Sequence, residues 1–312
     1  MVIEFIIVVL GLILFEVISS IDNAVINAKV LTTVSARARA WFLTWGLFIS
    51  VFLVRGLLPL FIVYVSNPSL GVVGALTSAF SSDPRVTAAI ESSKASLLAG
   101  GGIYLVLLFV HWLLRENDSF AWNVERTVRR VRGYGYYGVS AAVVAGVVWA
   151  ARADGQAVLT AIFVGTAAFV ATSLLKANAA RHEAKATASG QGDISKLLYL
   201  ELIDATFSID GVLGAFAFTT AVPLILVGNG IGAIVVRQIT IKGIDVVSKL
   251  PYLTNGAMYS VVVLGLVMLI ESHHIEVPFF VTPLFTVIIV GYFGYRSWRA
   301  AQGRTGQPQA SK

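Results

Sequence analysis

Nine apolar stretches, most of them about 20 residues long, divide this chain of 312 residues. A membrane-spanning helix needs roughly 20 mostly apolar residues, so each stretch is a candidate span. Strand-type alternation is absent over these lengths, which argues against a membrane β-barrel. The sequence therefore predicts an all-α, polytopic transmembrane helical bundle. The nine predicted spans are 3–29, 41–65, 94–114, 135–151, 157–175, 195–220, 222–241, 252–270 and 278–297. Counts of eight and ten stay open, because the fourth and fifth stretches are short.

Composition excludes several other classes of protein. Only 13% of the residues are charged and 57% are hydrophobic, whereas soluble domains carry about 25% charged residues. With no cysteine, the chain has neither a disulfide framework nor a thiolate zinc site. No nucleophile motif, nucleotide-binding loop or metal-hydrolase motif occurs, so we expect neither an enzyme nor a tightly bound cofactor.

Basic residues gather in alternate loops between the predicted spans. One set of loops holds Lys29, Arg37, Arg39, Arg115, Arg126, Arg129, Arg130, Arg132, Lys176, Arg181, Lys185, Lys196, Lys242 and Lys249, and the C-terminal tail adds more. The opposite side has only Arg85, Lys94 and Arg152. The positive-inside rule then predicts a cytoplasmic (inner) membrane protein with its N-terminus outside and its C-terminus inside. The charge is scattered and has no aromatic platform, so it favours the lipid bilayer as partner over nucleic acid.

A sequence motif occurs twice, once in each half of the chain. Glu16 precedes a Ser-Ile-Asp ending in Asp22, and Asp204 precedes a Ser-Ile-Asp ending in Asp210 at the same spacing. Two further pairs follow in the same order. They are Gly46 to Arg55 with Gly228 to Arg237, and Gly101 to Tyr104 with Gly256 to Tyr259.

Five predicted spans separate the starts of the two units, so the units have opposite orientations in the membrane. Inverted three-helix repeats of this kind are typical of secondary transporters, whose substrates bind near the bilayer midplane. The predicted organisation is as follows: first repeat 1–115, linker with two helices 116–194, second repeat 195–272, additional helix 273–298, and disordered cytoplasmic tail 299–312.

Acids in the middle of apolar spans point to a bound cation. Each such acid costs at least about 2.5–3.5 kcal/mol unless something compensates its charge. Two acids six residues apart lie roughly 120° apart on a regular helix. A local break at Ser19 and Ser20, or at Thr206 and Ser208, would let both face one ion. As an alternative, the acids form buried salt bridges with arginines that only lock the helices together.

The types of side chain narrow the cation. Carboxylate and amide oxygens suit Mg²⁺, Ca²⁺ or Mn²⁺ rather than zinc or copper. The candidate metal ligands are Glu16, Asp22, Asn23, Glu201, Asp204 and Asp210. Arg55 and Arg237 are candidates for an ion-pathway or helix-locking role. Four acids and these two arginines total −2, which a divalent cation would neutralise.

The same motifs resemble the signatures of the TerC family of integral membrane proteins. The first is Glu16 to Asn23, the second is Glu201 to Asp210, and the third is Asn229 to Arg237. The resemblance covers about residues 10–270, and Gly211 stands where the second signature usually has Ser. It implies kinship with LysE-type exporters, an association with tellurite resistance and, in several members, manganese efflux.

We therefore expect a transporter that exports divalent cations, with Mn²⁺ favoured over Mg²⁺ and Ca²⁺, by alternating access around midplane carboxylates. Proton counter-transport is a further expectation, since vacated carboxylates take up protons. Two alternatives stay open. One is a membrane anchor that docks stress-response proteins on loops 115–134 and 176–196, and the other is an oxyanion carrier that uses the arginines. A homo-oligomer also stays open.

Overall fold

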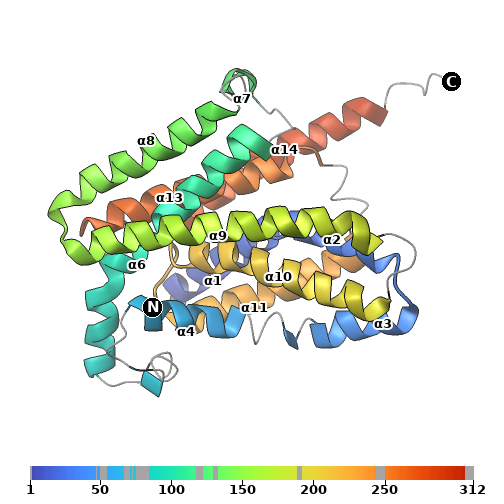
Figure 1. Ribbon diagram of the computed structural model, residues 1–312, viewed down its shortest axis with the longest axis horizontal. Coiled ribbons are helices and arrows are strands. Elements are labelled where there is room, and N and C mark those ends of the chain that lie inside the picture. The colour runs from blue at the N-terminus through green and yellow to red at the C-terminus, as the bar shows by residue number, and fades with distance from the viewer. Residues whose placement is uncertain are drawn as a thin grey trace.

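Every regular element of the described chain is a helix. The computed structural model describes residues 2–46, 48–49, 55–66, 71, 73–74, 84–116, 122–128, 133–187, 192–243 and 250–305. The result confirms the predicted all-α helical bundle (Figure 1). The longer helices are α1 (Val2–Ser19), α2 (Ile21–Leu31), α4 (Arg55–Ser66), α6 (Pro84–His111), α8 (Tyr134–Ala150), α9 (Gln156–Thr187), α10 (Asp193–Ala215), α11 (Val222–Gln238), α13 (Leu253–Ser272) and α14 (Val281–Thr305). The short ones are α3 (Ala36–Trp41) and α7 (Asn123–Val128).

Six helices of the described chain are long and apolar enough to cross a membrane. They are Val2–Ser19, Ser93–Glu116, Tyr134–Ala153, Gln156–Asn178, Val222–Ile241 and Leu253–Ser272, and each falls on one of the nine predicted spans. The chain is therefore a multi-pass membrane protein. The predicted side of each terminus, the repeat boundaries and the inverted repeat itself remain predictions.

The three other predicted spans differ from expectation, each for a physical reason. α10 covers most of 195–220 but carries five charged residues, too many for a span recognised by composition alone. α14 covers most of 278–297 and carries three arginines toward its C-terminal end. It continues to Thr305, so the predicted disordered tail from 299 begins as helix. Within 41–65, α3 ends at Trp41, a π-helical turn follows at Phe42–Gly46, and α4 begins at Arg55.

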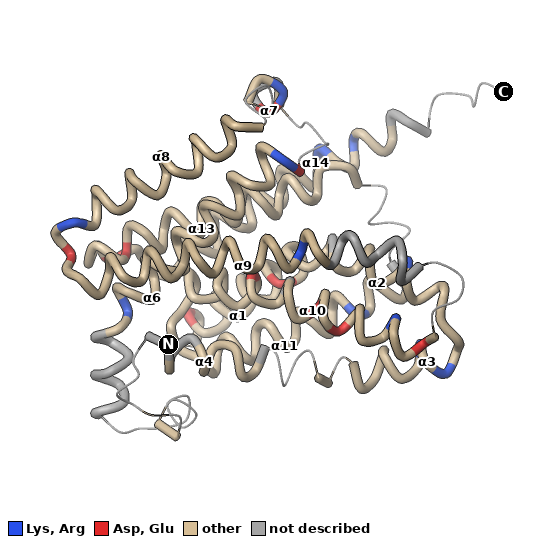
Figure 2. The backbone as a smooth tube through the Cα atoms, in the orientation of Figure 1, with Lys and Arg blue, Asp and Glu red and all other residues tan. Residues whose placement is uncertain are grey.

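α6 lies at the centre of the bundle. It packs mainly against α13 and α9, while α1 packs mainly against α11. Figure 1 shows α7 and α8 at one edge, α3, α4 and α11 at the opposite edge, and α1, α9 and α13 between them. The largest apolar core joins side chains of these central helices, among them Leu12, Leu98, Ile162 and Met268, all almost completely buried. Figure 2 shows tan tubes through most of the bundle, with acidic residues inside it near α1 and α10.

Glycines allow the central helices to cross closely. A Cβ atom on Gly102 would lie 2.9 Å from the carbonyl oxygen of Gly265, and one on Gly265 would lie 3.0 Å from that of Gly102. A Cβ atom on Gly165 of α9 would overlap the carbonyl oxygen of Gly100 on α6. Small residues at helix crossings are the usual means of close packing in membranes, where water does not drive helices together.

We predict that Gly165→Ala destabilises the protein by about 1–3 kcal/mol, because the backbones of α6 and α9 must separate to admit the methyl group. Gly146→Ala in α8 is the matched control, since nothing lies within 4 Å of a Cβ atom there. Thermal unfolding of the detergent-purified variants would measure both. Equal melting temperatures for the two variants would contradict the close α6–α9 crossing.

Candidate functional site

The first motif lies at an interruption between α1 and α2. α1 ends at Ser19, and Ser20, with φ −94° and ψ 3°, separates it from α2. The Ser20 hydroxyl donates a hydrogen bond of 3.0 Å to Oε1 of Glu16, whose side chain is completely buried. An irregular residue thus stands at the predicted break, although the backbone hydrogen bonds from Ser20 to Glu16 and from Ala24 to Ser20 continue across it, and Ser20 provides the buried acid with a donor.

A polar stripe runs along α1 and α2. Glu16, Ser20, Asn23 and Asn27 follow one another at steps of four, three and four residues, which places them on one face. All four are buried, with at most 6% of any residue exposed. The Oδ1 atoms of Asn23 and Asn27 accept no hydrogen bond from the described residues. Buried amide oxygens of this kind are suited to coordinating a cation, since nothing else in the described structure satisfies them.

The second motif, on α10, lies directly opposite this stripe. Nδ2 of Asn23 donates a hydrogen bond to Oδ1 of Asp204. About two turns further along α10, a Cβ atom on Gly211 would lie 2.8 Å from Oε2 of Glu16. From Glu16 to Asn23 the number rises by seven, and from Gly211 to Asp204 it falls by seven, so the helices run antiparallel. This is the relation that an inverted repeat requires of its first helices.

The two contacts join equivalent positions of the repeated motif. Each joins the leading acid of one motif to the residue that follows the closing aspartate of the other. Their chemistry differs, however. The longer acid, Glu16, faces Gly211, which has no side chain, whereas the shorter acid, Asp204, faces Asn23 and receives its amide hydrogen bond. At one contact a single long side chain fills the space between the helices. At the other, two shorter side chains fill it together.

α11 forms a third wall beside Glu16. A Cβ atom on Gly232 would lie 2.6 Å from Cβ of Glu16, so the acid is enclosed between α10 and α11. Asn229, one turn earlier on α11, is 1% exposed. Neither Nδ2 nor Oδ1 of Asn229 has a hydrogen-bond partner among the described residues. A buried amide with both atoms unsatisfied is unusual, because desolvating a polar group without a partner costs free energy.

Asp210 does not join this group, contrary to the expectation that all the acids converge on one ion. α10 is continuous from Asp193 to Ala215, without the predicted break. The hydroxyls of Thr206 and Ser208 donate back to the carbonyls of Leu202 and Asp204, at 2.8 Å and 2.6 Å, within an intact helix. Asp210 therefore points to another side of α10.

The partners of Asp210 come from α6 and α9. The Tyr104 hydroxyl donates a hydrogen bond of 2.5 Å to Oδ1, and Nζ of Lys176 forms an ion pair with Oδ2. Oγ1 of Thr172 lies 3.0 Å from the same tyrosine hydroxyl. The sequence placed Lys176 in a cytoplasmic loop, but α9 extends through it to Thr187. The total charge of −2 predicted for the four acids and two arginines therefore left out the positive charge of Lys176.

Arg237 donates to the backbone and also lies within electrostatic range of Glu201. Its Nη2 donates 2.7 Å to the carbonyl oxygen of Phe42, and its Cζ lies 4.5 Å over the Phe42 ring. Phe42 begins a π-helical turn, which alters the regular backbone hydrogen bonding there. This arrangement favours the helix-locking role for Arg237. The side chains of Asp22 and Arg55 lie outside the described residues, although their backbones lie in α2 and α4.

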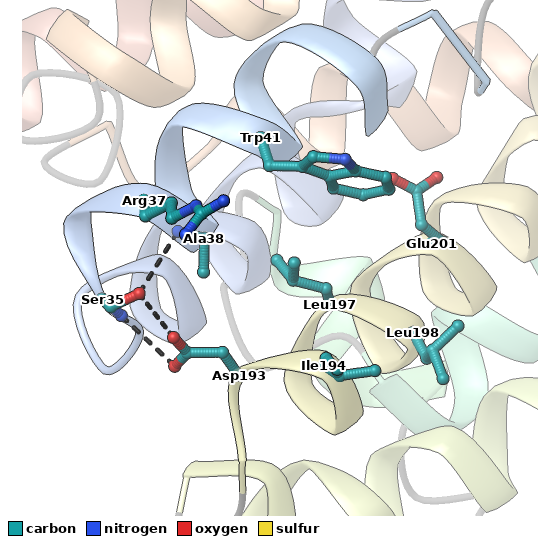
Figure 3. Close-up of a pocket in the computed structure, with 9 residues that line it drawn as sticks. All are labelled: Ser35, Arg37, Ala38, Trp41, Asp193, Ile194, Leu197, Leu198 and Glu201. Carbon is teal, nitrogen blue, oxygen red and sulfur yellow. Dashed lines mark hydrogen bonds between the residues drawn. The ribbon is translucent and has the colours of Figure 1, made fainter.

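Glu201 lines a pocket of about 350 Å³ between α3 and α10. Figure 3 shows Glu201 beside Trp41 at one end of the pocket and Asp193 beside Ser35 at the other. The Ser35 hydroxyl donates 2.5 Å to Asp193, and this bond and that from the Ser35 amide lower the pKa of the Asp193 carboxyl. Oε1 of Glu201 is buried without a hydrogen-bond partner in the described chain. The pocket thus leads to an acid one turn from Asp204.

One buried acid was not singled out from the sequence. Glu125 on α7 is 1% exposed and accepts hydrogen bonds of 3.0 Å from Tyr259 and 3.3 Å from Asn255. The ring centroids of Trp122 and Tyr259 lie 4.7 Å apart. The repeated Gly-to-Tyr motif could have indicated this acid. Its two tyrosines, Tyr104 and Tyr259, each donate a hydrogen bond to a buried or half-buried carboxylate.

Among the described residues, no three His, Cys, Asp or Glu side chains stand close enough to hold a metal ion by themselves. A cation between α1, α2 and α10 would therefore need amide or backbone oxygens in addition to Glu16 and Asp204. Among the described residues, the buried amides of Asn23, Asn27 and Asn229 carry oxygens that accept no hydrogen bond.

Comparison with known proteins agrees with a membrane family. A family described as "Protein of unknown function (DUF475)" matches residues 21–302. The uncharacterized membrane protein YceF of Bacillus subtilis (strain 168) is 31% identical over 97 residues, which is 31% of this chain and 37% of YceF. The matched region thus spans little more than a third of that relative. No solved structure matches the chain. The TerC resemblance remains a prediction.

We predict that Asn23→Leu destabilises the metal-free protein by about 1–3 kcal/mol, because Asp204 loses its amide donor inside the bundle. Asn178→Leu, at an exposed position of α9, is the control and should change stability by less than about 0.5 kcal/mol. Chemical or thermal unfolding in detergent with a chelator present would measure the difference. Equal stability of both variants would rule out a structural Asn23–Asp204 hydrogen bond.

Proposed function

We propose that this chain, which belongs to the DUF475 family, is a membrane transporter of divalent cations. The observation that carries the proposal is the crossing of α1 and α2 with α10. The Asn23 amide binds Asp204 there, and about two helical turns along the same crossing Glu16 lies buried against Gly211, both inside an apolar bundle. Carboxylates at membrane depth are costly and mark ion pathways when they are enclosed by protein.

The donor set supports a hard divalent cation as cargo. Glu16 and Asp204 supply carboxylates, and Asn23, Asn27 and Asn229 supply amide oxygens without other partners in the described chain. Oxygen-only donors suit Mn²⁺, Mg²⁺ and Ca²⁺. We propose Mn²⁺ as the preferred cargo because the motifs resemble those of manganese exporters. Export across the cytoplasmic membrane, with the N-terminus outside, is part of the same proposal.

The pocket beside Glu201 supports a route from the surface to this crossing. Asp193, Glu201 and Asp204 lie at steps of eight and three residues along one face of α10, in line with the pocket between α3 and α10. A row of acids lowers the electrostatic cost of moving a cation between apolar walls. We propose that cations reach the site along this row from the cytoplasmic side. Alternating access then exposes the crossing to the other side, and protons take the place of the cation on the vacated carboxylates.

The alternative functions have less support. An oxyanion such as tellurite would need available guanidinium groups, but Arg237 already donates to the Phe42 carbonyl. A membrane anchor for stress-response proteins would use surface loops, and much of the proposed docking loop 176–196 belongs to α9 and α10. Neither alternative accounts for buried acids and amides at one crossing.

We predict that Asp204→Asn abolishes Mn²⁺ flux in proteoliposomes, because the substitution removes one of two carboxylates at the crossing but keeps its size. Glu276→Gln, at an exposed acid after α13, is the matched control and should transport like the unaltered protein. Mg²⁺, Ca²⁺ and tellurite fluxes measured in parallel would rank the cargo.

Three outcomes would contradict the proposal. Undiminished Mn²⁺ flux in Asp204→Asn would remove the site. Tellurite flux that depends on Arg237 but not on Asp204 would favour the oxyanion carrier. An unaltered protein that moves none of these ions would leave the anchor as the better explanation.

A further inference from the structure

The two motif contacts lie at different levels of the bundle. At one contact, Oε2 of Glu16 faces Gly211. At the other, seven residues away along both helices, Nδ2 of Asn23 donates to Asp204. Seven residues of helix span about 10 Å. A hard divalent cation lies about 2.0–2.6 Å from each ligand oxygen, so one ion joins oxygens that are at most about 5 Å apart. The two contacts are therefore too far apart to share one cation.

Asn229 on α11 lies near the level of Glu16, on the side away from the second contact. A Cβ atom on Gly228 would lie 2.5 Å from Cβ of Leu12. One turn later, a Cβ atom on Gly232 would lie 2.6 Å from Cβ of Glu16, so α11 runs parallel to α1. Asn229 directly follows Gly228 and therefore stands between the levels of Leu12 and Glu16.

Each of the two acids has its own amide oxygen at its level of the bundle. Asn229 is 1% exposed, and neither of its amide atoms has a hydrogen-bond partner among the described residues. Beside Asp204, the Oδ1 atoms of Asn23 and Asn27 likewise accept no hydrogen bond from the described chain. A buried polar group without a partner costs free energy, and an ion that binds there offsets the cost. The amides therefore point to one cation beside Glu16 and another beside Asp204.

Two divalent cations about 10 Å apart repel each other strongly where water is excluded. The two positions are therefore filled in turn rather than together, and the ion moves from one to the other. Ion pathways use several positions of this kind, because an ion must be able to leave each one as well as enter it.

We propose that the crossing holds two successive cation positions instead of one. The Glu16 position uses the carboxylate of Glu16 and the amide oxygen of Asn229. The Asp204 position uses the carboxylate of Asp204 and the amide oxygen of Asn23. Each binds a hard divalent cation such as Mn²⁺, with water as the remaining ligands. The inference rests on the proposed function, and it assigns Asn229 to one position only.

The first test measures Mn²⁺ binding to detergent-purified protein in which one position is removed at a time. In Asp204→Asn only the Glu16 position remains, so adding Asn229→Leu should weaken the remaining binding about tenfold or more. In Glu16→Gln only the Asp204 position remains, so the same addition should change binding by less than about twofold. Asn178→Leu, at an exposed position of α9, is the matched control in both backgrounds.

The second test alters neither acid, so it stands even where Asp204→Asn or Glu16→Gln fails to fold. In protein kept free of metal by a chelator, Asn229→Leu should raise the melting temperature. Leucine has nearly the shape of asparagine but leaves no unsatisfied amide in the bundle. Asn255→Leu is the contrasting control and should lower the melting temperature, because Asn255 donates hydrogen bonds to Glu125.

The outcomes separate this inference from the function on which it rests. Binding that Asn229→Leu weakens only in the Asp204→Asn background supports two positions, as does a higher melting temperature of Asn229→Leu. Three results overturn the inference alone, provided that the unaltered protein binds Mn²⁺. They are an equal effect of Asn229→Leu in both backgrounds, loss of all binding in Asp204→Asn or Glu16→Gln alone, and a melting temperature of Asn229→Leu that is not raised. Absence of Mn²⁺ binding by the unaltered protein overturns the proposed function, and the inference falls with it.

Discussion

A carboxylate inside an apolar bundle must be given partners by the helices around it, and this requirement governs the arrangement of α1, α2, α6, α9, α10 and α13. Glu16 has the Ser20 hydroxyl, and Asp204 has the Asn23 amide. Asp210 has Lys176 and Tyr104, and Glu125 has Tyr259 and Asn255. Glu16 is enclosed only because α10 and α11 approach α1 closely, and the glycines at positions 211 and 232 allow them to do so.

Much of the fold and part of the site follow from sequence patterns. Apolar length identifies the six strongest spans, since hydropathy depends only on local composition. The repeated acids identify Glu16, Asn23 and Asp204 as neighbours, because equivalent motifs in opposite orientations meet where their helices cross. Hydropathy is a weaker signal for α10, which carries five charged residues.

The direction of Asp210 and the place of Lys176 depend on features that sequence leaves ambiguous. Serine and threonine hydroxyls either interrupt a helix or donate back to its carbonyls, and Thr206 and Ser208 do the latter. Lysines beyond an apolar run are ordinarily assigned to loops, yet α9 continues past Lys176 as helix. The buried position of Glu125 depends on tertiary contacts of α7 with α13, which no local pattern encodes.

The crossing of the two motifs also constrains how the sequence can change over time. Glu16 is one methylene longer than Asp204, and Gly211 lacks the side chain that Asn23 has, so the longer acid stands opposite the smaller residue. A longer residue at 211 leaves room only for a shorter acid at 16, and a smaller residue at 23 leaves Asp204 without its donor. Substitutions at 16 and 211, and likewise at 23 and 204, are therefore expected to arise in compensating pairs among homologues. Residues almost two hundred positions apart in the chain would then change together during evolution.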